Sequence, residues 1–485
     1  MSINTLVKSV QDIMRKDTGV DGDAQRISQL VWLLFLKIFD DKEQEWELTI
    51  ENYTSPLQPQ HRWSAWASNP EGITGEELID FVNNDLFPAL KKLKGHSVPQ
   101  GHVVGLIFED AYNYMKSGTL LRQVINVIEE DLDFNSMQDR HLFNDIYEKI
   151  LGDLQSAGNA GEYYTPRAVT QFMVDIIDPK LGEIILDPAC GTGGFLTGVV
   201  DHLKKQAKTP ADNLKIQENV RGVEKKPLPH QLAMTNMMLH GIDVPTQIRH
   251  DNTLARPLRD YRASERVDVV LANPPFGGIE ENGIEFNFPS NYQTRETADL
   301  FMALIMHLLK DGGRAGVVLP DGFLFGEGVK THIKKELLHS FNLHTIIRLP
   351  KGVFSPYTNI KTNILFFEKG TPTQDVWFFE HPYPEGYKSY SRTRPLTRAE
   401  FDREIEWWGG AARVDRQENE YAWKVSVDDI VARNYNLDIK NPHEVEVTHG
   451  DPTELMAEYL ELTRQVQDAQ QALKEELMAA LGGGR

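Results

Sequence analysis

The 485-residue sequence predicts an α/β fold with a doubly wound, mainly parallel sheet of seven strands. An all-helical domain is expected before this sheet and a helical tail after it. Three observations support the prediction. Apolar residues follow helical spacing through roughly the first 155 residues. From about Gly158, short apolar segments alternate with segments of helix length, and helical spacing returns near the C-terminus.

The N-terminal segment is expected to form several helices, because its apolar residues recur every three or four positions. A first helix is indicated by Ile3, Leu6, Val7, Val10, Ile13 and Met14, and a second by Ile27, Leu30, Val31, Leu34 and Ile38. Further amphipathic stretches cover residues 77–93, 120–132 and 140–154. Trp63 and Trp66 lie in a polar, proline-containing connection and are expected to pack onto the helical domain.

The seven expected strands are short and apolar. They cover residues 183–186, 220–223, 246–249, 267–272, 315–319, 345–349 and 363–367. Helix-length segments separate most of them, which is typical of crossover connections between parallel strands. In such sheets ligands bind at the carboxyl ends of the strands, so the residues directly after each strand are the candidates for a site.

The last helix is expected over residues 453–481 and has an apolar seam. Its members are spaced four and three residues apart in turn: Leu455, Tyr459, Leu462, Val466, Ala469 and Leu473. This seam is compatible with packing on the chain's own domain and with pairing to another subunit. The predicted domains are a helical one at 1–157, a catalytic one at 158–445 and an associating helix at 446–485.

The composition restricts the compartment and the partners. The single cysteine, Cys190, excludes an internal disulfide, and neither a membrane span nor a signal peptide is evident, so the cytoplasm is expected. The net charge is −20 and the pI near 5.2. Nucleic-acid binding usually requires basic residues, so any such contact must use a local basic patch or a partner. Residues 387–398 are such a basic, tyrosine-containing strip, or else an ordinary solvated loop.

The turn Asn273-Pro274-Pro275-Phe276 directly follows the apolar run 267–272. The Asn273 side-chain oxygen and the Pro274 carbonyl can accept both hydrogens of a planar –NH₂ group, and the prolines stiffen the turn because their φ is fixed. The Phe276 ring offers a stacking face. A conjugated amine is a poor nucleophile, and two acceptors on its hydrogens favour a pyramidal, reactive form. A purely structural turn is the alternative for this motif taken alone.

A glycine-rich loop, residues 187–195, follows the first expected strand. It contains Asp187, Ala189, Gly191, Thr192, Gly193 and Gly194. The dinucleotide fingerprint fails because Leu196 occupies the third glycine position, and no phosphate-binding Gly-Lys-Ser/Thr follows. Glu224 ends the second strand, where a carboxylate can accept both ribose hydroxyls, and Asp251 and Asn252 end the third, near an adenine amine. This set suits a cationic, adenosine-containing ligand.

Together, these motifs resemble those of S-adenosylmethionine-dependent amino-methyltransferases of DNA, specifically the modification (M) subunits of type I restriction-modification systems. Residues 143–148, 361–367 and 435–439 are also similar to that family. So is the segment that the resemblance places over the methionine end of the cofactor: Glu162, Tyr163, Tyr164, Thr165, Pro166 and Arg167. The resemblance implies a class I S-adenosylmethionine-dependent methyltransferase fold.

The resemblance implies methyl transfer to N6 of a flipped adenine in double-stranded DNA, with Asn273, Pro274, Pro275 and Phe276 as catalytic residues and no metal. Cys190 is expected to pack rather than react. A separate specificity (S) subunit would recognise the DNA sequence. The complex would contain two M subunits per S subunit, with restriction (R) subunits in the nuclease form. The alternatives are a stand-alone adenine methyltransferase, a protein glutamine-amide methyltransferase, and an inactive scaffold that binds S-adenosylmethionine.

Overall fold

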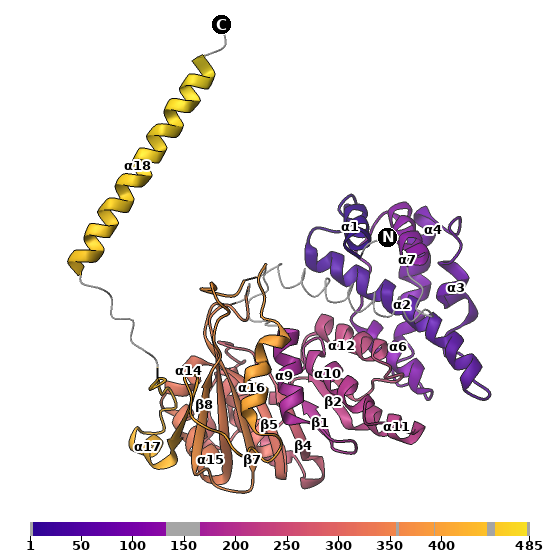
Figure 1. Cartoon of the computed structure of the whole chain (residues 1–485). Coiled ribbons are helices and arrows are strands. Elements are labelled where there is room, and N and C mark those ends of the chain that lie inside the picture. Colours follow the sequence, from indigo (N-terminus) through magenta and orange to yellow (C-terminus); the bar gives the residue numbers. More distant parts are fainter. Residues whose placement is uncertain (1–2, 132–164, 356–357, 392, 444–451, 483–485) are drawn as a thin grey trace. The chain divides into compact units, whose positions relative to one another are not determined.

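The structure is a computed structural model that describes residues 3–131, 165–355, 358–391, 393–443 and 452–482 (Figure 1). It divides into two compact units, Met1–Lys440 and Asn441–Arg485. The predicted helix at 140–154, the family-like residues 143–148 and both predicted domain boundaries, 157/158 and 445/446, lie outside the described residues. Within the described residues, no helix combines the length and apolar character needed to cross a membrane.

The N-terminal region is helical, as predicted. Its helices are α1 (Ile3–Met14), α2 (Asp23–Thr49), α3 (Trp63–Trp66), α4 (Gly75–Asp80), α5 (Phe87–Lys91), α6 (Pro99–Glu109) and α7 (Gly118–Asp131). Residues 77–93 do not form one helix, because a π-helical segment, η2 (Phe81–Leu86), separates α4 from α5. Leu30–Leu36 on α2 lies in the buried core, and Trp63 and Trp66 are buried as expected.

A single sheet of nine strands organises the rest of the first unit. The strands are β1 (Ile185–Asp187), β2 (Val220–Glu224), β3 (Ile248–His250), β4 (Val267–Ala272), β5 (Leu309–Pro320), β6 (Phe341–Leu349), β7 (Thr362–Lys369), β8 (Asp375–Glu380) and β9 (Ala422–Ser426). Their order is β3-β2-β1-β4-β5-β7-β6-β8-β9. The seven predicted strands form β1 to β7, which confirms the fold class, but the predicted strand number was wrong.

The two additional strands extend the sheet beyond β6. β8 pairs with β6 in parallel, and β9 pairs with β8 antiparallel. β7 is antiparallel to both β5 and β6, whereas β1, β2, β3, β4 and β5 run parallel. The carboxyl ends of β1, β4, β6 and β8 therefore lie at one edge of the sheet, here called the carboxyl edge.

Helices cover both faces of the sheet. The longer ones are α9 (Arg167–Ile177), α10 (Gly194–Lys204), α11 (Pro210–Asn219), α12 (Pro227–Leu239), α13 (Thr297–Leu308) and α15 (Val329–Ser340), and the shorter ones α14 (Asp321–Phe325), α16 (Asp402–Trp408) and α17 (Val427–Ala432). Alternate strand residues enter two buried clusters. One cluster contains residues of α9, α10 and α12, and the other residues of α13 and α15.

Short 3-10 helices occupy several connections: η1 (Pro59–His61), η3 (Thr253–Ala255), η4 (Leu258–Asp260), η5 (Ala263–Glu265), η6 (Ile284–Asn287), η7 (Ser290–Tyr292) and η8 (Arg398–Phe401). The N-terminal helices share a continuous buried cluster with α12 and the adjoining sheet face. Polar contacts reinforce this packing. Gln231 on α12 donates to the carbonyl of Ile107 on α6 at 2.9 Å, and Lys42 on α2 pairs with Asp243 at 3.1 Å.

The second unit contains α18 (Pro452–Gly482), close to the predicted 453–481. Several of its large apolar side chains are exposed: Met456, Tyr459, Leu460, Leu462, Val466 and Leu473. Four residues of the predicted seam, Tyr459, Leu462, Val466 and Leu473, are each more than half exposed, at 65%, 53%, 56% and 60%. These residues are therefore not packed within the second unit, and both interpretations of the seam stay predictions.

Candidate active site

The glycine-rich loop and the Asn-Pro-Pro-Phe turn lie at the same edge of the sheet. β1 and β4 are adjacent and parallel, with Ile185 beside Val269 and Leu186 beside Val270. Parallel neighbours end at a common edge, so the loop after Asp187 and the turn after Ala272 leave the sheet side by side. A donor held by the first loop and an acceptor held by the second would therefore be neighbours, as the sequence predicted.

The backbone of the glycine-rich loop explains two of its glycines. Gly191 and Gly193 have φ values of +55° and +83°, in the left-handed region that favours glycine. A Cβ added at Gly191 would meet nothing within 4 Å, so the loop is open there to a ligand. The loop closes through a bond from the Gly193 N–H to the Cys190 carbonyl at 2.8 Å, and α10 begins at Gly194.

Glu224 fastens the glycine-rich loop to the end of β2. Its carboxylate accepts the Gly191 N–H at 3.0 Å and the Lys226 N–H at 2.6 Å. A carboxylate has about four lone-pair sites and can accept several hydrogen bonds at once. The binding of ribose hydroxyls, which the sequence assigned to Glu224, stays a prediction. Asp251 is exposed and donates its N–H to the Glu224 carbonyl at 3.0 Å, whereas the Asn252 side chain caps η3 by accepting the Leu254 N–H.

Asp187 is buried at the base of this loop, with 2% of its surface exposed. Burial raises the pKa of its carboxyl to about 8, and the nearby Glu224 carboxylate adds to the increase, while a hydrogen bond from the Ala189 N–H opposes it. A carboxyl group in such an environment is ionised more readily when a cation binds beside it. The donor set thus fits a positively charged, hydroxyl-bearing ligand.

The Asn273–Phe276 turn is hydrogen-bonded to the residues that precede α9. The Asn273 amide nitrogen donates to the Thr165 hydroxyl at 2.9 Å, although 108 residues separate the two in sequence. Pro166 is the N-cap of α9, and Arg167 begins the helix. The segment containing Thr165, Pro166 and Arg167 thus lies at the turn. Glu162, Tyr163 and Tyr164 lie outside the described residues, and their predicted role stays a prediction.

Within the turn, Pro274 is buried, Pro275 is half-buried, and Phe276 is 5% exposed. The Phe276 ring contacts Phe354 edge to face, with 5.9 Å between ring centroids. Stacking of Phe276 on a base therefore requires the Phe354 segment to move or the base to enter beside it. Phe354 did not stand out in the sequence, because the β6–β7 connection has no local motif.

Two further side chains hold the glycine-rich loop and were missed in the sequence. Asn236 on α12 donates to the Thr192 carbonyl at 3.1 Å, and Thr253 donates its hydroxyl to the Pro188 carbonyl at 2.7 Å. Both side chains are buried. Asn236 did not stand out in the sequence, because α12 also contains the buried polar residues His230, Gln231 and Thr235. Cys190 is buried and its pKa is raised well above the usual value by burial and by the neighbouring carboxylates, which disfavours a reactive thiolate.

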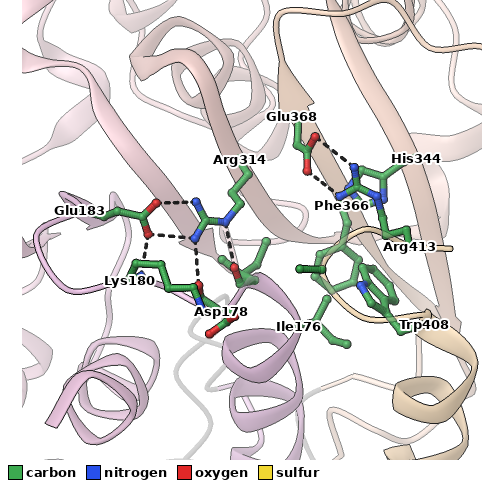
Figure 2. A pocket seen from close by; sticks show the side chains of 12 residues that line it. Ile176, Asp178, Lys180, Glu183, Arg314, His344, Phe366, Glu368, Trp408 and Arg413 are labelled. Carbon is green, nitrogen blue, oxygen red and sulfur yellow. Dashed lines mark hydrogen bonds and ion pairs between the residues drawn. The ribbon is translucent and has the colours of Figure 1, made fainter. Parts of the chain in front are cut away.

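Two other features were considered as sites. Glu109, Asp110 and His250 each place one potential ligand atom within 4.8 Å of the others, but exposed acidic groups of this kind are common without a metal ion. A cavity of about 260 Å³ lies at the edge opposite the carboxyl edge. Figure 2 shows the side chains that line it. Its arginines, Arg314 and Arg413, already form two-pronged ion pairs with Glu183 and Glu368, so neither feature is assigned a function.

The strand order and the two adjoining loops define a class I S-adenosylmethionine-dependent methyltransferase. The sequence profile of the family described as N-6 DNA Methylase matches residues 138–451, and that of the HsdM N-terminal domain matches residues 3–128. The chain belongs to the N-6 DNA methylase family, among the methylase subunits of type I restriction enzymes.

Individual relatives agree. The type I restriction enzyme EcoEI methylase subunit of Escherichia coli is 61% identical, covering 100% of this chain and 99% of its own. The EcoKI methylase subunit of E. coli K12 is 31% identical over 76% of this chain and 69% of its own. A crystal structure of a modification subunit from Vibrio vulnificus YJ016 has a TM-score of 0.83 and 43% identity, covering 92% of this chain and 98% of its own.

A second structural relative was solved to describe complex assembly and conformational transition of a type I restriction-modification system. Its TM-score is 0.79 at 36% identity, and the match covers 98% of each chain. These relatives support the main interpretation of the sequence over a glutamine-amide methyltransferase.

Proposed function

We propose that this chain transfers a methyl group from S-adenosylmethionine to N6 of a flipped adenine in double-stranded DNA, as the modification subunit of a type I restriction-modification complex. The observation that carries the proposal is the position of the Asn273–Phe276 turn. It lies beside the glycine-rich loop at one sheet edge, in a chain of the N-6 DNA methylase family.

In this proposal, one set of residues binds the methyl donor and another set binds the amine that accepts the methyl group. S-adenosylmethionine, when bound, supplies a methyl group on a positively charged sulfur, which is a good leaving group without a metal. Asp187 and the glycine-rich loop would hold this ligand, Glu224 its ribose, and Asp251 and Asn252 its adenine. The side-chain oxygen of Asn273 and the carbonyl of Pro274 would accept the two hydrogens of the target amine. Catalysis then consists mainly of positioning and hydrogen-bond acceptance.

The target adenine must leave the helix to reach this turn, at a cost of a few kcal/mol. Stacking against an aromatic ring is worth about 1–3 kcal/mol in single-strand binding, so contact with Phe276 would offset part of this cost. Because Phe276 is packed against Phe354, we expect the turn that carries Phe354 to move when the base enters.

Sequence recognition is assigned to a separate specificity subunit. The net charge of −20 disfavours high DNA affinity by this chain alone. The exposed seam of α18 offers an apolar face for a helix of a partner. The family resemblance further implies two modification subunits per specificity subunit, with restriction subunits in the nuclease form, and we expect the complex in the cytoplasm. The division into residues 1–157, 158–445 and 446–485 is part of this proposal.

The test is incubation of DNA with tritiated S-adenosylmethionine and the chain, alone or co-purified with its specificity partner, followed by nucleoside analysis. The complex is expected to produce N6-methyladenine at a specific sequence, and the chain alone to bind the cofactor but methylate poorly. Transfer of the tritiated methyl group to glutamine side chains of a protein would contradict the proposed reaction. The absence of N6-methyladenine after incubation with the complex would contradict it as well. Sequence-specific turnover by the lone chain would contradict delegated recognition.

A further inference from the structure

The connection between β8 and α16 carries basic residues at the same edge of the sheet as the catalytic turn. β6 and β8 are parallel to each other, and β6 runs in the same direction as β5, because both are antiparallel to β7. The turn after Leu349 and the connection after Glu380 therefore leave from the carboxyl edge. Figure 1 labels β8 and α16, which the second of these loops connects.

Three exposed basic residues in these loops form what we call the basic rim: Lys351, Lys388 and Arg394. Resting on the proposed function, we infer that the basic rim binds the phosphate backbone of the substrate DNA beside the flipped adenine. The rim has acidic neighbours in the exposed Glu385 and the part-exposed Glu380. The three basic residues outnumber these two acidic neighbours, so the rim is locally positive in a chain of net charge −20.

Contacts join the two loops of the rim. The Tyr383 hydroxyl donates to the Lys351 carbonyl at 3.0 Å. The backbone at Gly352 passes so close to Tyr390 that an added Cβ would lie 2.3 Å from the Tyr390 carbonyl oxygen. The guanidinium of Arg394 lies over the Tyr387 ring at 5.5 Å, and Tyr387 and Tyr383 both contact Tyr390. Lys351 and the β8–α16 connection therefore belong to one surface.

The rim adjoins the catalytic turn. Phe354, three residues after Lys351, makes the edge-to-face contact with Phe276. A base that reaches Asn273 must bring its own phosphates to the rim of the pocket, because base and phosphate belong to one nucleotide. Cations are needed at that position, and the basic rim supplies them where the acidic body of the protein would repel DNA.

The charges of the rim are available for an external partner. Arg398, in the same connection, is used internally, since it pairs with Asp175 on α9 at 2.6 Å and with Asp402 at 3.1 Å. In the described part of the chain, neither Lys351, Lys388 nor Arg394 forms an ion pair with a carboxylate. Within residues 387–398, the structure thus favours Lys388 and Arg394 over Arg398 as phosphate contacts.

Buried polar contacts fix the shape of the connection. His381, 2% exposed, bonds to the carboxylate of Glu404, 0% exposed, at 2.5 Å. The Tyr390 hydroxyl donates to Glu400 at 2.5 Å. Phe401 stacks on Phe172 of α9 with 4.2 Å between ring centroids. Because buried contacts of this kind restrict the loop before DNA arrives, less conformational entropy is lost on binding.

The test compares the co-purified complex carrying Lys388→Gln/Arg394→Gln with the wild-type complex, by measuring DNA affinity from 50 to about 200 mM salt. For each modification subunit whose rim contacts DNA, loss of two phosphate contacts lowers the slope of log K against log salt by about 2 and the affinity at 0.1 M salt by roughly 60-fold. We expect the same loss on cognate and non-cognate DNA, with unchanged cofactor affinity. Lys351→Gln should lower the slope by about one more.

The matched control is Lys205→Gln/Lys208→Gln, which removes the same charge beyond the end of α10, at the opposite edge of the sheet. It should leave the salt slope unchanged. Lys388→Arg/Arg394→Lys keeps the charges and should retain the wild-type slope, which separates charge from folding. An unchanged slope in the Gln variant overturns the inference. The inference is also overturned if the Gln variant no longer co-purifies with the specificity subunit while its salt slope is unchanged. That result would make the basic rim a protein interface.

Failure of the proposed function is distinguishable. A wild-type complex that binds DNA with a steep salt slope but makes no N6-methyladenine contradicts the reaction, while the comparison of slopes still decides the role of the rim.

Discussion

Asn273 joins the two halves of the candidate site through its side-chain amide. The nitrogen donates to Thr165, and in the proposed reaction the oxygen faces the amine of the substrate. The first bond is structural and the second catalytic, so substitutions can separate them. Thr165 offers the matched control, because Thr165→Val removes the same hydrogen bond and keeps the shape.

We expect Asn273→Ala to lower methyl transfer by about 100-fold or more, the loss seen when a single stabilising hydrogen bond is removed from a transition state. Cofactor affinity should stay near the wild-type value. Thr165→Val should cost about tenfold or less in turnover, since only positioning of the amide is weakened. Single-turnover transfer of tritiated methyl groups and calorimetric cofactor titration measure both. Equal loss of cofactor binding in Asn273→Ala would refute the catalytic role.

Asp187 gives the ligand-free protein a pH dependence. The pKa of its carboxyl is near 3.8 in the unfolded chain and about 8 in the folded one. Between these pH values the folded state binds one proton more than the unfolded state, so this residue makes stability fall as pH rises through that range. Asp187→Asn removes the effect. The difference in free energy of unfolding between variant and wild type should increase up to about pH 8 and then level off.

Urea unfolding of both proteins at a series of pH values provides the measurement. A difference that does not change with pH would mean that Asp187 is already ionised at low pH in the folded state. The same ionised form attracts a cation, so cofactor affinity of the wild type should rise with pH over this range.

At the scale of elements, α12 connects the helical N-terminal region with the glycine-rich loop. One of its side chains, Gln231, bonds to the Ile107 carbonyl on α6, and another, Asn236, to the Thr192 carbonyl. The helix thus holds the cofactor loop on one side and the N-terminal helices on the other. A change on α12 can affect cofactor binding without touching the cofactor.

We expect Asn236→Leu to weaken cofactor binding by about fivefold, because the Thr192 carbonyl loses its buried partner and the loop relaxes. A hydrogen bond of this kind contributes about 1 kcal/mol. Thr235→Val is the control on the same helix. The Thr235 hydroxyl bonds to the Gln231 carbonyl within α12, so its loss should leave cofactor affinity unchanged. Equal affinities for Asn236→Leu and wild type in a calorimetric titration would exclude a positioning role for Asn236.

At the scale of the whole molecule, α18 forms part of a unit of its own and has an exposed apolar seam. Two acidic substitutions in the seam, Leu462→Asp/Val466→Asp, should prevent a partner helix from packing there, since burying a carboxylate is costly. We expect loss of co-purification with the specificity subunit, while cofactor binding by the chain is retained.

The control is Gln467→Asp/Gln471→Asp, which adds the same charge on the other side of α18 and should leave the complex intact. Size-exclusion chromatography with light scattering reports both the association and the number of modification subunits. A complex that survives the seam substitutions would show that α18 is not the docking element.

The sequence alone determined the strand segments from β1 to β7 and their order along the chain, and it predicted the chemistry of the turn at Asn273. Helical and strand periodicities are local, and the glycine loop and proline turn have distinctive compositions that need no knowledge of distant residues. By contrast, β8 and β9 went unnoticed because short strands at the end of a sheet are specified by their pairing, here of β8 with β6 and of β9 with β8, rather than by their own pattern.

Only the tertiary structure decided which distant residues meet. The bonds from Asn273 to Thr165 and from Asn236 to Thr192, and the contact of Phe276 with Phe354, join segments with no shared local signal. The same holds for charge, because the sequence could not tell that Arg398 is neutralised by Asp175 while Arg394 stays on the surface. Such pairings depend on how the chain packs, and local periodicity carries no information about them.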